Sequence, residues 1–375
     1  MKKCFGSPKV SALLRKEAKV NINELGQLFF TGISGLSLTE EEKDFIQSNN
    51  IGGVILFKEN FQDPAQLSEL VNEIQTLRDE YPLFISVDQE GGRVKRFQTH
   101  FTQFPSMYEL GQQDSPKLVF EIHKAMAEEL STCGVNLNLS PCCDIWSNDN
   151  NKVIGDRAFG KTVEEVEKNI SAAIRGLHTG NVLACAKHFP GHGDTTKDSH
   201  FDLPYVKKSL KELKEFELQP FHKASKARVE FMMMAHLVVD AIDKELPCTL
   251  SPKAYDFLRD ELKFKKIIIS DDMEMKAISD RFSYGEAARM AFAAGVDILE
   301  YRSMPTTREA FEFVKQSVSD NNLNRQKMGE KIARVKDCKK RFLAEYKPIY
   351  IPNIHKTFKA PRYQNLLDQL GPASK

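Results

Sequence analysis

The sequence predicts an α/β protein built as a single-domain (β/α)8 barrel of the TIM type, somewhat irregular, with a C-terminal helix and an extended tail. Short apolar runs alternate with amphipathic, charge-rich stretches from about residue 25 to residue 317, which is typical of parallel strands joined by crossover helices. Eight such runs favour a closed barrel over an open sheet. The 375 residues are enough for a barrel of roughly 250 residues with insertions.

The strand candidates are short apolar runs, several of which end in polar residues. They cover residues 25–30, 51–57, 83–88, 135–140, 182–189, 229–236, 266–271 and 296–301. We expect the barrel domain to span residues 25–346, between an N-terminal segment, 1–24, and a tail, 347–375.

Helix start signals and helical spacing lie between these runs. They occur at Thr39, at Asp63 with Pro64, over residues 163–177 and at Ser251 with Pro252. Residues 322–346 have the pattern of one long charged helix. The tail is rich in proline and aromatic residues, so we expect a strap over the barrel or a flexible end.

Composition limits the classes of partner. With 53 basic and 52 acidic residues, the net charge of +1 does not indicate a nucleic acid or an anionic membrane. No apolar run approaches the roughly 20 residues that span a bilayer, and the basic start is not followed by the apolar core of a signal peptide. Seven scattered cysteines favour free buried thiols. We therefore expect a cytoplasmic protein, monomeric rather than oligomeric, that acts on a small molecule.

Polar residues follow several of the predicted strands. They are Asp88, Lys187 with His188, His236, and Asp271 with Asp272. The carboxyl ends of barrel strands form the rim where substrates bind. A charged residue at a strand end can also simply mark the exit to solvent, but several such ends favour a site.

Residues 187–200 interleave three histidines and two aspartates with turn-forming residues. A metal site is one interpretation, although no helical His-x-x-x-His spacing is present. A solvated loop without a role is another. The third is an acid/base dyad, because residues two apart in an extended segment point to the same side, so that Asp198 can orient the His200 imidazole.

Two further strand ends carry candidate groups. Asp271 follows a buried strand and is well placed to act as a nucleophile, while Asp272 is expected to cap the following helix. Asp88 precedes the pair Gly91 and Gly92 and could grip sugar hydroxyls together with a cation. The glycines lack the spacing of a dinucleotide or phosphate loop.

Together these motifs resemble the bacterial β-N-acetylglucosaminidases of glycoside hydrolase family 3, of the NagZ type involved in peptidoglycan recycling. The motifs are Val87-Asp88-Gln89-Glu90-Gly91-Gly92-Arg93-Val94, Ile154-Gly155-Asp156-Arg157, Lys187-His188-Phe189-Pro190-Gly191-His192-Gly193 with Asp198-Ser199-His200, and Ser270-Asp271-Asp272. The resemblance runs from about residue 25 to residue 310, in the family's order and approximate spacing.

The resemblance implies roles for eight residues. Asp271 would be the nucleophile, and His200 with Asp198 the acid/base dyad. The sugar-binding residues would be Asp88, Arg96, Arg157, Lys187 and His188. The implied activity is retaining hydrolysis of terminal β-linked N-acetylglucosamine, with a muropeptide of the GlcNAc-1,6-anhydroMurNAc type as substrate and no metal or organic cofactor.

Three alternatives remain open at this level. A phosphorylase would use phosphate in place of water on the same dyad. A sugar-binding barrel would lack catalysis, and a metallohydrolase would depend on a bound metal. Gly191 and Gly193 could also let the dyad swing in after the sugar binds.

Overall fold

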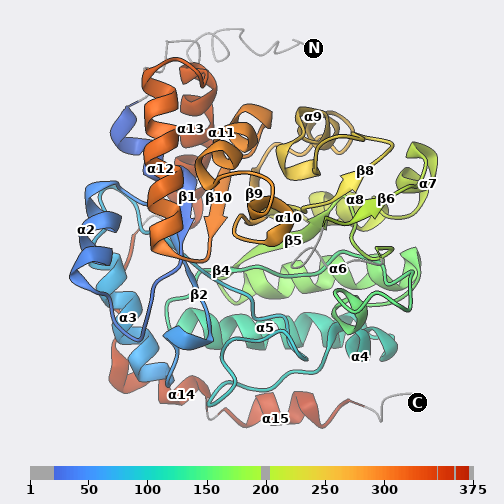
Figure 1. The fold of residues 1–375 in the computed structure, drawn as a ribbon. Helices are drawn as coiled ribbons and strands as arrows, with labels where there is room; N and C mark the ends of the chain where they lie inside the picture. Colours follow the sequence, from blue (N-terminus) through green and yellow to red (C-terminus); the bar gives the residue numbers. More distant parts are fainter. Residues whose placement is uncertain (1–20, 196–202, 344, 359, 371–375) are drawn as a thin grey trace, which may run out of the picture.

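The computed structural model describes residues 21–195, 203–343, 345–358 and 360–370. Eight parallel strands form a closed barrel in the order β1-β10-β9-β7-β5-β4-β3-β2, and helices surround it (Figure 1). The barrel strands are β1 Phe29–Thr31, β2 Gly53–Leu56, β3 Phe84–Val87, β4 Leu137–Asn138, β5 Leu183–Phe189, β7 Phe231–Met234, β9 Ile267–Asp272 and β10 Ile298–Tyr301. The predicted TIM-type barrel is confirmed.

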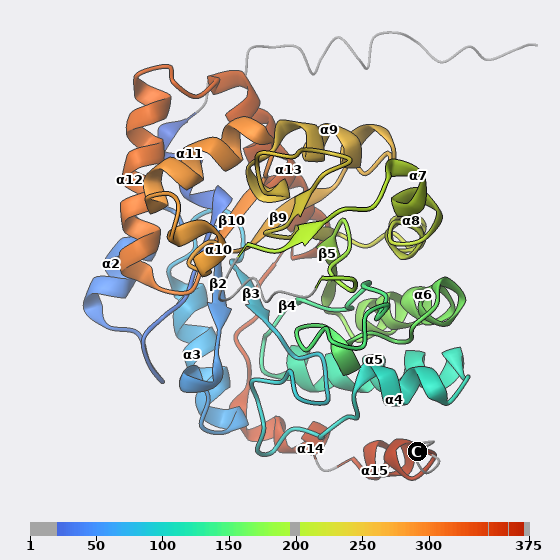
Figure 2. The same cartoon turned by 45° about the vertical axis from the view of Figure 1, so that its right-hand side comes forward.

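The helices lie outside the strands, as the turned view in Figure 2 also shows. The α-helices are α2 Glu40–Ser48, α3 Pro64–Thr76, α4 Met107–Gln112, α5 Pro116–Thr132, α6 Val163–Thr179, α7 Leu210–Glu215, α8 Gln219–Lys226, α9 Pro252–Asp260, α10 Lys276–Ser279, α11 Tyr284–Ala294, α12 Met304–Ser319, α13 Arg325–Phe342, α14 His355–Phe358 and α15 Pro361–Leu367. None of the helices in the described ranges is long and apolar enough to cross a bilayer.

Several helix starts are as predicted. Thr39 caps α2 with a capping box to Glu42, and Asp63 accepts hydrogen bonds from two backbone N–H groups at the start of α3. Ser251 stands at the N-cap of α9, but its hydroxyl donates to Asp243 Oδ2 at 2.7 Å and makes no cap hydrogen bond. The local pattern predicts the start of α9 but not the partner of Ser251.

The first strand begins later than predicted. Residues 25–28 belong to the 3-10 helix η2, Ile22–Leu28, and only Phe29–Thr31 pairs in the barrel. Leu25 and Leu28 are fully buried, and an apolar run that is buried on all sides has no period that separates helix from strand.

The tail crosses the surface of the barrel but is not extended throughout. The 3-10 helix η6, Ile351–Asn353, packs against α3, and helices α14 and α15 lie along α5 (Figure 1). Asn72 and Ile349 exchange hydrogen bonds of 2.8 and 3.1 Å, and Tyr363 Oη donates to Glu128 Oε2 at 3.0 Å. The described part of the tail is therefore tied to the barrel at several points.

A second, small sheet lies near the rim. Strands β6, Tyr205–Val206, and β8, Val238–Val239, pair in parallel. Because β6 directly follows residues 203–204, this pairing fixes the chain on the C-terminal side of the segment 196–202.

Candidate active site

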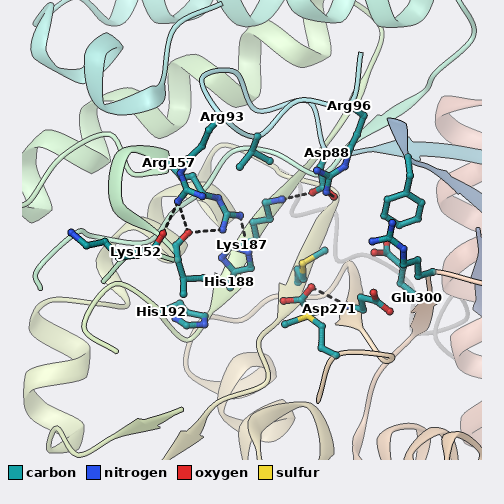
Figure 3. Close-up of a pocket in the computed structure, with 17 residues that line it drawn as sticks. Asp88, Arg93, Arg96, Lys152, Arg157, Lys187, His188, His192, Asp271 and Glu300 are labelled. Atoms are coloured by element: carbon teal, nitrogen blue, oxygen red, sulfur yellow. Dashed lines mark hydrogen bonds and ion pairs between the residues drawn. The ribbon is translucent and has the colours of Figure 1, made fainter. Parts of the chain in front are cut away.

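One cavity of about 370 Å³ opens at the carboxyl ends of the barrel strands (Figure 3). It is lined by all of the predicted sugar-binding residues and by the predicted nucleophile: Asp88, Arg96, Arg157, Lys187, His188 and Asp271. The predicted dyad, Asp198 and His200, lies outside the described residues. The structure therefore brings six of the eight predicted residues to one place.

A buried ammonium group joins two strand ends. Lys187, in β5, is 2% exposed and its Nζ lies 2.6 Å from Asp88 Oδ1 and 2.7 Å from Glu90 Oε1. Asp88 Oδ2 in turn lies 2.8 Å from Arg96 Nη2. These contacts fix the side chains of Asp88 and Lys187 at the cavity wall.

Glu90, which sequence analysis did not single out, extends this network to Arg157. Arg157 Nε and Nη2 donate to the two Glu90 carboxylate oxygens at 2.9 and 2.8 Å, a bidentate pair. Glu90 lies in the motif that follows β3. Its importance is seen only in the structure, where it is 1% exposed and binds both Lys187 and Arg157.

The tautomer of His188 follows from its partners. Arg157 Nη2 lies 3.2 Å from His188 Nε2, and a guanidinium can only donate, so Nε2 accepts. Nδ1 therefore carries the proton and donates to Asp144 Oδ2 at 2.7 Å. Asp144 also accepts the backbone N–H of His192 at 2.6 Å, so this buried carboxylate, likewise not predicted, orients both histidines.

The network stays ionised at neutral pH. Burial alone would raise the pKa of Asp88 and of Glu90, but the facing Lys187 and Arg157 outweigh it. They hold the pKa of Asp88 well below its usual range and lower that of Glu90 to about 2. Burial likewise opposes the charge of Lys187, yet Asp88 and Glu90 raise its pKa. Fixed charges of both signs can bind sugar hydroxyls as donors and as acceptors.

β9 ends in the two aspartates. Asp271 lines the cavity, and its Oδ1 accepts the backbone N–H of Asp272 at 2.9 Å. Asp272 does not cap a helix as predicted: it ends β9, accepts the N–H of Glu274 at 2.9 Å, and α10 starts later with Met275 at its N-cap. Burial raises the pKa of Asp272 to about 7, which makes it a poorer anion at neutral pH.

His236 does not line the cavity. Its Nε2 lies 2.9 Å from the Asp272 carbonyl oxygen and its Nδ1 2.7 Å from Thr249 Oγ1, and the ring is fully buried. A carbonyl oxygen can only accept, so Nε2 carries a proton. His236 thus supports the end of β9 next to Asp271.

The start of the dyad loop is anchored. Gly193 packs against Ile145 so closely that a Cβ there would lie 1.6 Å from the Ile145 carbonyl oxygen. Asn151 Nδ2 donates to His192 O at 2.7 Å, and Thr195 Oγ1 lies 2.7 Å from His192 Nδ1. Close packing thus accounts for Gly193. His192, which was not among the predicted site residues, also lines the cavity.

Three buried side chains have donor atoms that a metal could use. Cys142, Asp144 and His188 place one atom each within 4.8 Å of one another. His188 Nδ1 and the Cys142 thiol already donate to Asp144 Oδ2, the thiol at 3.2 Å, and burial raises the pKa of Cys142 well above its usual range. These three groups therefore hydrogen-bond to one another, and the mechanism proposed for the site does not use a metal.

Comparisons with known proteins agree with this geometry. Residues 19–338 match the model of the glycosyl hydrolase family 3 N-terminal domain. A β-hexosaminidase of Neisseria meningitidis serogroup C is 39% identical over 280 residues, 72% of this chain and 77% of the relative. Another, from Alkalilimnicola ehrlichii, is 37% identical over 282 residues, 73% of this chain and 80% of the relative.

A solved structure shares the fold closely. The family 3 β-N-acetylglucosaminidase from Paenibacillus sp. str. FPU-7 superposes with a TM-score of 0.90 at 32% identity, covering 94% of this chain and 68% of that chain. The family match, the relatives and the barrel with its charged cavity lead to one conclusion: the chain is a glycoside hydrolase and belongs to glycosyl hydrolase family 3.

Proposed function

We propose that the chain is a retaining exo-β-N-acetylhexosaminidase that releases terminal β-linked N-acetylglucosamine. The relatives and the Paenibacillus structure carry the names of such enzymes. The observation that carries the proposal is the position of Asp271, which shares a cavity with the hydroxyl-binding groups Asp88 and Lys187 (Figure 3). A sugar held by its hydroxyls can then present its anomeric carbon to Asp271.

In the proposed mechanism the Asp271 carboxylate attacks the anomeric carbon while His200 protonates the departing glycosidic oxygen. Water then hydrolyses the glycosyl-enzyme, and neutral His200 takes its proton. An imidazole with an unperturbed pKa of about 6.5 can serve both steps. The supporting observation concerns the described residues on each side of the segment with Asp198 and His200: His192 is hydrogen-bonded to Asn151 and Thr195 before it, and β6 pairs with β8 after it.

Basic side chains that line the cavity support the proposal of an anionic aglycone. Arg93 and Arg302 line it with side chains 47% and 53% exposed, each in an ion pair with one carboxylate, Asp156 or Glu59, and the exposed Lys152 lines it as well. These cations favour a leaving group that carries carboxylates, such as a muropeptide of the GlcNAc-1,6-anhydroMurNAc type. The six described cysteines are free and buried, which supports a reducing compartment such as the cytoplasm. We propose that the protein acts there as a monomer, in peptidoglycan recycling.

The test is hydrolysis of an aryl β-N-acetylglucosaminide by the wild type, Asp271→Ala and the matched neighbour Asp272→Asn. We expect Asp271→Ala to be inactive and Asp272→Asn to keep most activity. Product formed in phosphate buffer should be free sugar; sugar 1-phosphate would identify a phosphorylase instead. A wild type that binds the sugar without hydrolysing it would be a non-catalytic barrel and would end the proposal.

His200 is tested by the leaving group. If His200 is the acid, His200→Ala should lose little kcat/KM with an activated phenol and much more with a natural sugar, because kcat/KM reports the step in which the leaving group departs and a good leaving group needs little protonation. Equal losses with both substrates would argue against this role.

A further inference from the structure

Glu300, in β10, is a cavity carboxyl group that the proposed reaction does not use. It lines the cavity, is 3% exposed, and its Oε2 has no hydrogen-bond partner among the described residues. Its backbone is fixed, since its N–H donates to Ser270 Oγ at 3.0 Å and its carbonyl oxygen accepts the Met273 N–H at 3.0 Å. The barrel therefore holds an unpaired polar atom at the cavity.

The position of Glu300 complements the sugar-binding network. Figure 3 shows it on the side of the cavity away from Arg157 and His188. A sugar whose hydroxyls contact that network would leave its other edge towards β10. On that side Glu300 has a side-chain oxygen without a hydrogen-bond partner among the described residues.

The surroundings of Glu300 favour its neutral form. Burial comes first, and the facing Asp88, Asp272 and Asp271 add to it, so that the pKa of Glu300 lies well above its usual range. Lys187 acts in the opposite direction, but its ammonium is shared by Asp88 and Glu90. A protonated carboxyl group can donate a hydrogen bond from its O–H.

We infer that Glu300 binds the sugar in this cavity, donating a hydrogen bond from its carboxyl O–H to a sugar oxygen on the β10 side. The inference rests on the proposed function, because it takes N-acetylglucosamine as the ligand. It also accounts for a buried polar group without a partner among the described residues, because the sugar supplies a hydrogen-bond acceptor. Glu300 is thereby a substrate-binding residue, separate from the nucleophile and the dyad.

Two variants test this role. Glu300→Gln keeps an N–H donor and should bind N-acetylglucosamine within a few-fold of the wild type, measured by calorimetry. Glu300→Leu has no donor and should weaken binding, and lower kcat/KM for an aryl β-N-acetylglucosaminide, by about 10-fold, as expected for one lost hydrogen bond. The same variant should raise Tm, because it removes a buried unpaired carboxyl group.

Glu129→Leu is the matched control. Glu129 is also a buried carboxyl group, but it lies outside the cavity lining and accepts hydrogen bonds from Thr102 N at 3.1 and 3.0 Å. Its loss should lower Tm and leave sugar binding per folded molecule unchanged. Opposite signs of the Tm change in the two leucine variants would mark Glu300 as a group kept for binding.

The outcomes separate the two proposals. A wild type that neither binds nor hydrolyses N-acetylglucosaminides would overturn the proposed function and the ligand assigned to Glu300. A wild type that does both, with Glu300→Leu unchanged in binding and kcat/KM, would overturn the role of Glu300 alone. Tighter binding of glucosamine than of N-acetylglucosamine would also overturn it, since an ammonium ligand calls for an ionised carboxylate.

Discussion

At the amino ends of the strands, buried lysines of α13 donate to backbone carbonyl groups, whereas at the carboxyl ends the buried Lys187 lies between two carboxylates at a cavity. Lys339 Nζ donates to Gly52 O at 2.7 Å and Gln27 Oε1 at 2.8 Å, and Lys331 Nζ donates to Val296 O at 2.6 Å. These three acceptor residues precede the strands β10, β1 and β2, so α13 is hydrogen-bonded to this end of the barrel.

The two ends of the barrel differ in how far the described residues supply partners for their buried carboxyl groups. Asp297, fully buried at the amino end, pairs with both Arg259 and Arg334 and accepts the Ile268 N–H at 2.8 Å. At the carboxyl end, Glu300 lines a cavity and its Oε2 has no hydrogen-bond partner in the described part of the chain. We infer from this comparison that the buried ion pairs of Asp297 stabilise the fold, while the carboxyl group of Glu300 is kept for a ligand.

The largest expected effect contrasts one aspartate from each end. Asp271→Asn should lower kcat by roughly 10⁴-fold or more with little change in Tm, because it removes the nucleophile alone. Asp297→Asn should leave kcat per folded molecule unchanged but cost about 3–5 kcal/mol of unfolding free energy, since two partly buried arginines lose the buried charge that pairs with them. Aryl glycoside kinetics and urea unfolding measure both. Swapped effects would break the comparison.

Lys187→Met should affect both properties. It leaves Asp88 and Glu90 buried without their ammonium, so we expect a loss of about 3–5 kcal/mol in unfolding free energy. Sugar binding should weaken as well, because Lys187 and the oriented Asp88 are hydroxyl-binding groups. Calorimetry with N-acetylglucosamine and urea unfolding test this. A stable variant with unchanged binding would show that Lys187 is dispensable.

The amino-end lysines predict a pH dependence. Burial lowers the pKa of Lys339 to about 7 and that of Lys331 to about 8, against about 10.4 in an unfolded chain. The unfolded protein binds more protons between these values, so Lys339 makes the unfolding free energy rise with pH from about 7 to about 10, by at most about 1.4 kcal/mol per unit. Urea midpoints should rise less with pH in Lys339→Met than in the wild type. An identical rise in both proteins would refute this assignment.

The smallest effects are expected at the cavity mouth. Arg93→Gln and Lys152→Gln should raise KM for an anionic muropeptide a few-fold and leave KM for a neutral aryl glycoside unchanged, because exposed charges interact weakly in water. Added salt should reduce the difference. Equal changes for both substrates would mean that these cations act on the sugar, and would remove the support for an anionic aglycone.

The fold could be predicted from the sequence further than the supporting contacts could. Alternating apolar runs and helix caps such as Thr39 depend on local order along the chain, and they led to the eight-stranded barrel. Leu25 and Leu28 misled the strand assignment because full burial hides the period of a helix.

The residues of the candidate site also fall into two groups, those that sequence position indicates and those that only the structure identifies. Asp88, Lys187 and Asp271 stand at strand ends, where sequence position indicates the rim. The sequence does not single out Glu90, Asp144 or Glu300 as site residues. Their importance comes from burial and from partners distant in sequence, such as His188 for Asp144. Asp272 failed as a helix cap because β9 continues through it.

The central claim, that Asp271 forms a glycosyl-enzyme with help from His200, is tested most directly by trapping. His200→Ala should react with an activated aryl β-N-acetylglucosaminide but hydrolyse the intermediate slowly, because no base activates water. Mass spectrometry of the quenched variant should then find one N-acetylhexosaminyl unit on the peptide that contains Asp271. An unmodified protein, or a label on Asp272, would contradict the account.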